Sequence, residues 1–236
     1  LVAAFDHRHI FFDPDPDPAK SWKERARMFK LPRSSWADYD AKLISKGGGI
    51  FPRAAKEIKL TPQIKAMLGV SESVMEPSAL IAAILTCQAD LIWFGGIGTY
   101  IKARAESNAE VGDRANDAHR VNAEDVRAKV IGEGANLGVT QAARIAFGLK
   151  GGRINTDFID NSAGVDCSDN EVNIKVARNG EVAAGRLKME ARNILLASMT
   201  DDVAHLVLED NRLQTLALSI AEHDGASALP SLIRLV

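Results

Sequence analysis

The sequence predicts an α/β fold with a mostly parallel sheet, followed by a helical C-terminal segment. Three observations support this class. Short apolar runs alternate with helical patterns over the first two-thirds of the 236-residue chain. One of these runs, LIWF at residues 91–94, stops abruptly at a group of glycines. From residue 184 onward, strand patterns are absent and apolar residues recur at helical spacing.

The first elements follow from local signals. Residues 1–5 form a candidate strand. The DPDPDP run at residues 13–18 excludes regular structure, because each proline lacks an N–H and restricts the residue before it. Ser21 and Glu24 have the spacing of a capping box, so a helix is expected to open there. Residues 45–53, SKGGGIFPR, are expected to form a flexible surface loop.

The next elements bring the first strong strand–helix alternation. Residues 56–60 are a weak strand candidate. Thr61 and Pro62 form a helix start, in which a capping residue is followed by proline at the first helical position. Residues 78–88 are expected to form a buried helix, and residues 90–94 the strand after it.

The remaining elements continue this alternation and then leave it. The polar segment at residues 108–121 is expected to pack over the strand ends. Residues 128–132 are expected to form a strand, residues 140–149 a helix and residues 153–159 a further strand. Two or three amphipathic helices are expected to close the chain.

Composition and charge exclude several classes of function. A formal net charge of −2 gives no global electrostatic reason to expect nucleic acid or an anionic membrane as a partner. No apolar run approaches the ~20 residues needed to span a bilayer. Cys87 and Cys167 are too few for a disulfide scaffold, so a reducing cytoplasm is expected. His7 and His9 have no further ligands that the sequence places near them, so no metal site is expected.

Small or polar residues follow each predicted strand. Ligands bind beyond the carboxyl ends of strands in open α/β sheets. Glycine lets a ligand approach the backbone closely, and Asn or Asp can hydrogen-bond ribose hydroxyls or a carboxamide. We call the residues that directly follow a strand its exit. Four exits that converge at one edge of the sheet therefore predict a binding site for a dinucleotide. Its candidate residues are Asp6 after the first strand, Gly95, Gly96 and Gly98 after the second, Asn136 after the third and Asn161 after the fourth.

The glycine turn at residues 95–98 is an incomplete dinucleotide fingerprint. The fingerprint needs G-x-G-x-x-G after the first strand, and here Gly96-x-Gly98 is followed by Ile101. It also needs an acidic residue at the end of the next strand, a position that Asp6 has. We therefore expect a Rossmann-like, doubly wound sheet that lacks its first strand. The glycine turn would then be a later exit that lines the same crevice.

Two segments resemble those of glutamate dehydrogenases. Residues 133–136, EGAN, follow a predicted strand, as the same motif does in the shorter enzymes. Residues 161–168, NSAGVDCS, are similar to their N-A-G-G-V-x-x-S segment. The remaining segments, including ADLIWFGGIGTYIKA and GDRANDAHRV, closely resemble the large bacterial NAD-specific glutamate dehydrogenases. This resemblance covers nearly the whole chain.

The resemblance implies oxidative deamination of L-glutamate to 2-oxoglutarate and ammonium, with hydride transfer to NAD. It implies that Asp6 holds the adenine ribose and that Asn136 contacts the nicotinamide-side ribose or carboxamide. Val165 and Ser168 would face the substrate, with the Ser168 hydroxyl on the side-chain carboxylate of glutamate. The catalytic lysine and aspartate of such enzymes belong to the substrate domain. No catalytic residue is therefore expected in this chain, which is expected to be inactive alone.

The same residues leave alternatives open. Asp6 favours NAD because a carboxylate accepts from the ribose 2′-OH and repels a 2′-phosphate, whereas the nearby Arg8 suits a phosphate. A dehydrogenase for another amino acid, such as leucine, would carry an apolar residue where Ser168 stands. A non-catalytic, dinucleotide-binding regulatory module is the alternative from a different class. Asp113 and Arg114 are either a simple ion pair or residues with a cofactor or domain-closure role.

The expected organisation has two parts. Residues 1–180 are expected to form an NAD-binding Rossmann-like domain that is truncated at its N-terminus. Residues 181–236 are expected to form a helical C-terminal segment. We further expect the remainder of a longer chain as a partner, and a homo-oligomer.

Overall fold

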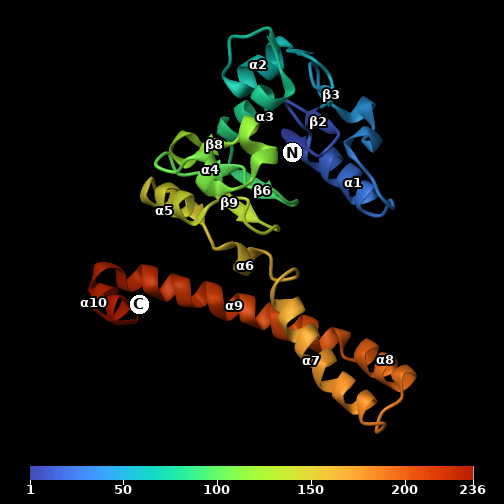
Figure 1. The fold of residues 1–236 in the computed structure, drawn as a ribbon. Coiled ribbons are helices and arrows are strands. Elements are labelled where there is room, and N and C mark those ends of the chain that lie inside the picture. Colours follow the sequence, from blue (N-terminus) through green and yellow to red (C-terminus); the bar gives the residue numbers. More distant parts are fainter. Residues whose placement is uncertain (236) are drawn as a thin grey trace. The chain divides into compact units, whose positions relative to one another are not determined.

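The computed structural model describes residues 1–235, which form two compact units (Figure 1). The first unit comprises residues 1–132 and 137–154. The second comprises residues 133–136 and the chain from residue 155 onward. The predicted class is confirmed at this level, because the chain is mixed α/β with parallel strand pairs and C-terminal helices.

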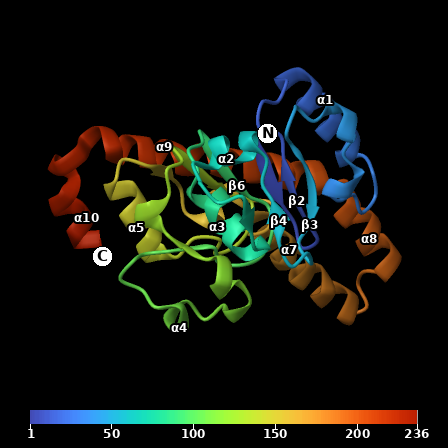
Figure 2. The same ribbon diagram turned by 90° about the horizontal axis from the view of Figure 1, so that it is seen from above.

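Three antiparallel strands form the N-terminal sheet of the first unit. They are β1 (Ala3–Phe5), β2 (His9–Phe12) and β3 (Gly49–Pro52), with β2 in the centre. They lie side by side in both views (Figures 1 and 2). The strand predicted at residues 1–5 is confirmed, although it pairs antiparallel. Residues 10–12 of β2 are fully buried and supply the core of this sheet.

The flexible loop predicted at residues 45–53 is wrong over its second half. Residues 49–52 form the edge strand β3, because Ile50 and Phe51 find apolar partners on and around β2. The Phe51 ring contacts that of Phe12 at a centroid distance of 6.2 Å. Gly48 lies so close to the chain that a Cβ there would be 2.4 Å from the Phe12 carbonyl oxygen. The absence of a side chain at Gly48 thus lets the backbone come close to β2, which places β3 beside it.

Helix α1 (Pro18–Phe29) begins earlier than predicted. Asp17 is its N-cap, and the Asp17 carboxylate accepts hydrogen bonds from two backbone N–H groups of the first turn, at 3.0 and 3.1 Å. Pro18 then takes the first helical position, where no N–H is needed. The capping box predicted at Ser21 and Glu24 is wrong. The helix is already capped by Asp17, and Ser21 and Glu24 are buried residues within its length.

The carboxylate of Glu24 is almost fully buried and ties α1 to the following turn. Arg27 donates to it through Nε and Nη2, at 2.8 and 2.6 Å. The backbone N–H of Asp40 donates at 2.8 Å. The Arg27 hydrogen bonds, aided by the Asp40 N–H, hold the pKa of Glu24 below its ordinary value although burial opposes them.

Replacement of Glu24 by glutamine is expected to lower the free energy of unfolding by about 1–3 kcal/mol, because charge-assisted bonds are lost in a buried place. The folded-state pKa lies below the unfolded one. The contribution is therefore present above the unfolded pKa and is lost as pH falls through the folded pKa. Urea unfolding at neutral and acidic pH measures both effects.

Glu209 provides the matched control for this prediction. It binds Arg212 through the same two bonds, at 2.8 and 2.6 Å, but at the surface. Glu209→Gln is expected to cost much less, because solvent and salt screen an exposed ion pair. Equal losses in the two variants would show that burial of the pair is irrelevant.

Short elements connect the two three-stranded sheets. Strands β4 (Ile58–Lys59) and β5 (Val74–Met75) flank helix α2 (Pro62–Leu68), and helix α3 (Pro77–Thr86) follows. The Thr61 hydroxyl caps α2 as predicted, accepting from the N–H of Ile64 at 3.2 Å. The buried helix predicted at residues 78–88 is confirmed by α3. The 3₁₀ turns of the first unit are η1 (Trp36–Asp38), η2 (Ala41–Leu43), η3 (Arg114–His119) and η4 (Ala123–Asp125).

The second sheet has the order β10-β9-β6. Its strands are β6 (Leu91–Phe94), β9 (Val130–Glu133) and β10 (Arg153–Ile154), and β9 pairs parallel with β10. Helix α5 (Gln141–Leu149) connects β9 to β10 and is capped by Thr140. A further parallel pair comprises β7 (Ile101–Lys102) and β8 (Val121–Asn122), with helix α4 (Asn108–Val111) between them.

The strand predicted at residues 153–159 is only partly confirmed. The strand ends at Ile154, and residues 157–160 form the short helix α6 (Asp157–Asp160). Polar groups cause this change, because Asn155 Nδ2 donates to Asp160 Oδ1 at 3.0 Å and closes the segment on itself. Asn161 therefore follows a helical turn and not a strand.

The second unit consists mainly of helices. Besides α6, they are α7 (Asp166–Ala183), α8 (Met189–Ser198), α9 (Thr200–Asp224), the turn η5 (Gly225–Ala228) and α10 (Leu229–Leu235). Helices α7, α8 and α9 contact one another (Figure 1). Since α7 runs without a break across residue 180, the boundary predicted there would divide a helix; the extent of an NAD-binding domain stays a prediction. Within residues 1–235, each helix is too short or too polar to cross a bilayer.

Candidate functional site

Two of the predicted exits, those of β1 and β6, are brought together in the first unit. Phe5 is the last residue of β1, and its ring meets that of Tyr100 edge-on at a centroid distance of 5.6 Å. Tyr100 also stacks on Phe94, the last residue of β6, at 5.6 Å. Asp6 and Gly95 directly follow these two strand ends. Aromatic packing thus joins the predicted ribose-binding residue and the predicted glycine turn.

Asp6, for which ribose binding is predicted, has a structural role in the first unit. Its Oδ1 accepts hydrogen bonds from the backbone N–H groups of Arg8 and His9, both at 2.7 Å, and Oδ2 accepts from that of Trp36 at 3.3 Å. Burial raises the pKa of Asp6, but these bonds outweigh it and the pKa falls below its usual value. The side chain is 23% exposed. An ionised carboxylate has about four acceptor positions, and these three bonds occupy three of them.

The three glycines of the turn differ in the space that surrounds them. Gly98 has φ +114°, and a Cβ there would be 2.5 Å from Asn116 Nδ2, so only glycine fits. A Cβ on Gly96 would meet nothing within 4 Å, and one on Gly95 would lie 3.6 Å from the Trp93 ring nitrogen. The backbone at Gly95 and Gly96 is therefore open to an approaching ligand.

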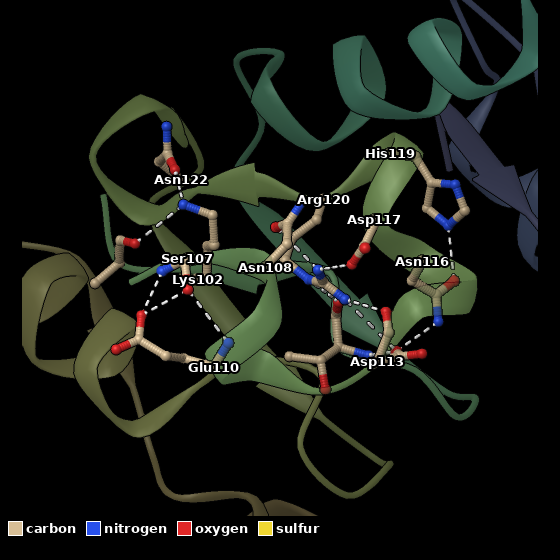
Figure 3. A network of polar contacts seen from close by, with 12 residues as sticks. Lys102, Ser107, Asn108, Glu110, Asp113, Asn116, Asp117, His119, Arg120 and Asn122 are labelled. Carbon is tan, nitrogen blue, oxygen red and sulfur yellow. Dashed lines mark hydrogen bonds and ion pairs between the residues drawn. The ribbon is translucent and has the colours of Figure 1, made fainter. Parts of the chain in front are cut away.

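Sequence reasoning missed a polar network in residues 99–122 (Figure 3). The ion pair considered for Asp113 and Arg114 is wrong, because Asp113 instead contacts Arg120, Thr99 and Asn116. A signal for this network was present in the sequence. Asp113, Asn116 and His119 are spaced three residues apart, which places their side chains on one face of a 3₁₀ helix such as η3.

Hydrogen bonds shift the pKa of Asp113, whereas burial and neighbouring charges shift that of His119. The N–H of Thr99 and the amide of Asn116 hold the pKa of Asp113 below its usual range. Burial, together with the charges of Arg53 and Arg120, lowers the pKa of His119. At neutral pH the network therefore contains an ionised carboxylate and a neutral imidazole.

Two other predicted residues meet in the second unit. Asn161 Nδ2 donates to Asn136 Oδ1 at 2.7 Å. The N–H of Glu133, at the end of β9, donates to Asp160 Oδ2 at 3.0 Å. Leu137, which directly follows Asn136, has φ +55°, a backbone conformation that is rare for a residue other than glycine. Strained backbone of this type persists where its surroundings hold it and is enriched at ligand sites.

The predicted substrate residues lie at the start of α7. Val165 is the N-cap residue and Ser168 is the third residue of the helix. Ser168 is exposed, and within residues 1–235 its hydroxyl has no hydrogen-bond partner. A helix N-terminus favours an anion. Burial and the neighbouring Asp210 raise the pKa of Asp166 above its usual value.

The predicted residues therefore form two groups, one in each unit. Asp6 and the glycine turn belong to the first unit, and Asn136, Asn161, Val165 and Ser168 to the second. In the part of the chain that the structure describes, no cluster of three or more His, Cys, Asp or Glu side chains could hold a metal ion. What the two groups offer is chemistry for hydrogen bonding and anion binding.

Comparison with known proteins shows the family of this chain. The family profile described as "Bacterial NAD-glutamate dehydrogenase, catalytic domain" matches residues 1–221. The chain belongs to this family. Because the description calls the matched region catalytic, the expectation that it contains no catalytic residue is not confirmed.

Three relatives named NAD-specific glutamate dehydrogenase support the assignment. The protein of Mycobacterium tuberculosis is 60% identical over 98% of this chain. Those of Pseudomonas aeruginosa and Halomonas elongata are 56% and 55% identical over 100% and 94% of it. The chain spans only 14–15% of the length of these relatives.

Proposed function

We propose that this chain is part of an NAD-dependent glutamate dehydrogenase, which converts L-glutamate and NAD⁺ into 2-oxoglutarate, ammonium and NADH. The observation that supports this most strongly is the identity of 55–60% with three proteins of that name over nearly the whole chain. The chain would act with the remainder of a longer protein, since its relatives are about seven times as long.

In this proposal the first unit supplies cofactor-binding groups of a Rossmann-like fold. Asp6 accepts a hydrogen bond from the adenine ribose, and Gly95, Gly96 and Gly98 provide a backbone without side chains beside the dinucleotide. The low pKa of Asp6 supports NAD as the cofactor, because an ionised carboxylate repels a 2′-phosphate.

The second unit supplies the remaining groups. Asn136 contacts the nicotinamide-side ribose or carboxamide, and Asn161 holds the Asn136 amide in place through the bond at 2.7 Å. Ser168 donates to the side-chain carboxylate of glutamate, and Val165 offers apolar contact. The exposed hydroxyl at the N-terminus of an 18-residue helix supports this role.

The groups that activate the α-carbon are assigned to another part of the longer protein. Hydride transfer needs the substrate and the nicotinamide in a near-attack geometry. The residues named above bind and orient these two molecules, and none of them is proposed to transfer a proton. The two free cysteines support a reducing cytoplasm as the location.

The test is NADH formation by the full-length protein, with L-glutamate and L-leucine compared side by side and with NAD⁺ and NADP⁺ as cofactors. Turnover of glutamate with NAD⁺ is expected, with weak turnover of leucine. Preference for leucine would favour another amino-acid dehydrogenase. NADH binding without turnover of either amino acid would favour a regulatory dinucleotide-binding module.

Self-association is a separate expectation, which rests on β6. This strand lies at the edge of its sheet within residues 1–235, with Leu91 and Trp93 55% and 59% exposed. An exposed apolar edge strand is prone to pair with another chain. Sedimentation of the 236-residue chain at rising concentration is expected to show oligomers. A clean monomer at high concentration would contradict this expectation.

A further inference from the structure

Four side chains from residues 113–120 hold the segment that follows the glycine turn (Figure 3). We call Asp113, Asn116, His119 and Arg120 the η3 clasp. The first three are spaced at the repeat of a 3₁₀ helix and are linked in a row. Asn116 Nδ2 donates to Asp113 Oδ2 at 2.6 Å, and Asn116 Oδ1 lies 2.7 Å from His119 Nε2. They therefore act as one connected unit.

This row contacts three consecutive residues of the strand exit. The Asn116 amide lies against Gly98, in the space that a Cβ would need. Asp113 Oδ2 accepts from the backbone N–H of Thr99 at 2.8 Å. The ring of His119 stacks on the next residue, Tyr100, at a centroid distance of 5.5 Å.

Arg120 completes the clasp from a fully buried position. Its Nε donates to the Thr99 carbonyl at 2.8 Å, so the clasp binds both the N–H and the C=O of Thr99. Its Nη2 donates to the carbonyl of Asp113 at 2.5 Å, and Nη1 donates to Asn108 and Asp117. A buried guanidinium needs these partners, because each unpaired N–H would cost free energy.

The need for such a clasp follows from the turn itself. Three of the four residues at 95–98 are glycine, the residue that loses most conformational freedom when it is ordered. Within the first unit, no side chain would restrict a Cβ at Gly96. A ligand that binds such a turn must order it, unless the protein has already done so.

We propose that Asp113 and Arg120 are positioning residues that fix the conformation of the glycine turn for the dinucleotide. This inference rests on the proposed function, which assigns the turn to NAD. Neither side chain needs to touch the cofactor. They act through the backbone of Thr99, and their loss should weaken cofactor binding far more than glutamate binding.

The experiment uses the full-length protein with Asp113→Asn and Arg120→Lys. NADH affinity is measured by fluorescence titration, and the KM for glutamate at saturating NAD⁺. The expected result is a rise of about tenfold in the NADH Kd, with a glutamate KM within about twofold of the unaltered protein. Arg104→Lys and Asp125→Asn are matched controls. That pair, at 2.6 Å, lies at the surface and is outside the clasp; its loss should leave both constants unchanged.

Failure of the inference and failure of the proposed function give different results. Absence of NADH binding by the unaltered protein would refute the proposed function. Normal binding by that protein and by both folded variants would overturn the clasp inference, as would equal changes in the two constants. Asn116→Ala serves if the other variants do not fold, because it leaves buried Arg120 intact. We expect it to raise the NADH Kd several-fold, and an unchanged Kd would also overturn the inference.

Discussion

Ser168→Ala in the full-length protein is expected to raise the KM for L-glutamate about 10–100-fold, with a smaller change in kcat. A hydrogen bond to a charged group contributes about 1.5–3 kcal/mol, and each 1.4 kcal/mol is a factor of ten. The hydroxyl has no partner within residues 1–235, so its removal should leave stability nearly unchanged. Steady-state kinetics at saturating NAD⁺ measures the effect.

The charges around Ser168 act both against and in favour of glutamate binding. Asp166 and Asp169 lie on the same turn as Ser168, and carboxylates repel the side chain of glutamate. The N-terminus of α7 acts in the opposite direction, because a helix N-terminus favours an anion. Ser198→Ala is the control, because this exposed hydroxyl donates to the Leu195 carbonyl at 2.8 Å and has no proposed ligand. A glutamate KM equal in both variants would remove Ser168 from the substrate site.

Gly98→Ala is expected to destabilise the first unit by about 2–4 kcal/mol. A φ of +114° is rarely adopted by alanine, and the new methyl group would meet Asn116 Nδ2 at 2.5 Å. Displacement of this amide would also break its bonds to Asp113 and His119. Urea unfolding, followed by the fluorescence of Trp93 two residues before the turn, measures the loss.

Gly96→Ala is the matched control in the same turn. A methyl group there meets nothing within 4 Å, so stability is expected to change by less than about 1 kcal/mol. It would nevertheless stand beside the dinucleotide in the proposed site and should weaken NADH binding. Equal destabilisation by the two substitutions would show that the turn does not have the conformation described here.

Much of the fold could be predicted from local sequence. Thr61-Pro62 caps α2, the apolar run at residues 78–88 is a buried helix, and residues 91–94 form a strand. These predictions succeed because the cap, the periodicity and the glycine stop are properties of adjacent residues. The prediction for residues 45–53 fails because three glycines suggest mobility, whereas packing of Ile50 and Phe51 against β2 makes them an edge strand.

For the candidate site, too, some features follow from local sequence and others depend on tertiary contacts. The sequence alone indicates its residue types, which are Asp6, the glycine turn, Asn136 and Ser168, and the segments EGAN and NSAGVDCS indicate the family. Their roles stay proposals. Which of them meet depends on contacts between distant segments, such as Phe5 with Tyr100 and Asn136 with Asn161.

The α/β class, the family and the chemical groups available for binding follow from the sequence alone. The antiparallel pairing of β1, the edge strand β3 and the η3 clasp depend on contacts between distant segments. The difference lies in the range of the interactions. Caps and periodicity act over three or four neighbouring residues, whereas Arg120 binds the Thr99 carbonyl 21 residues away and is buried only because the fold brings them together.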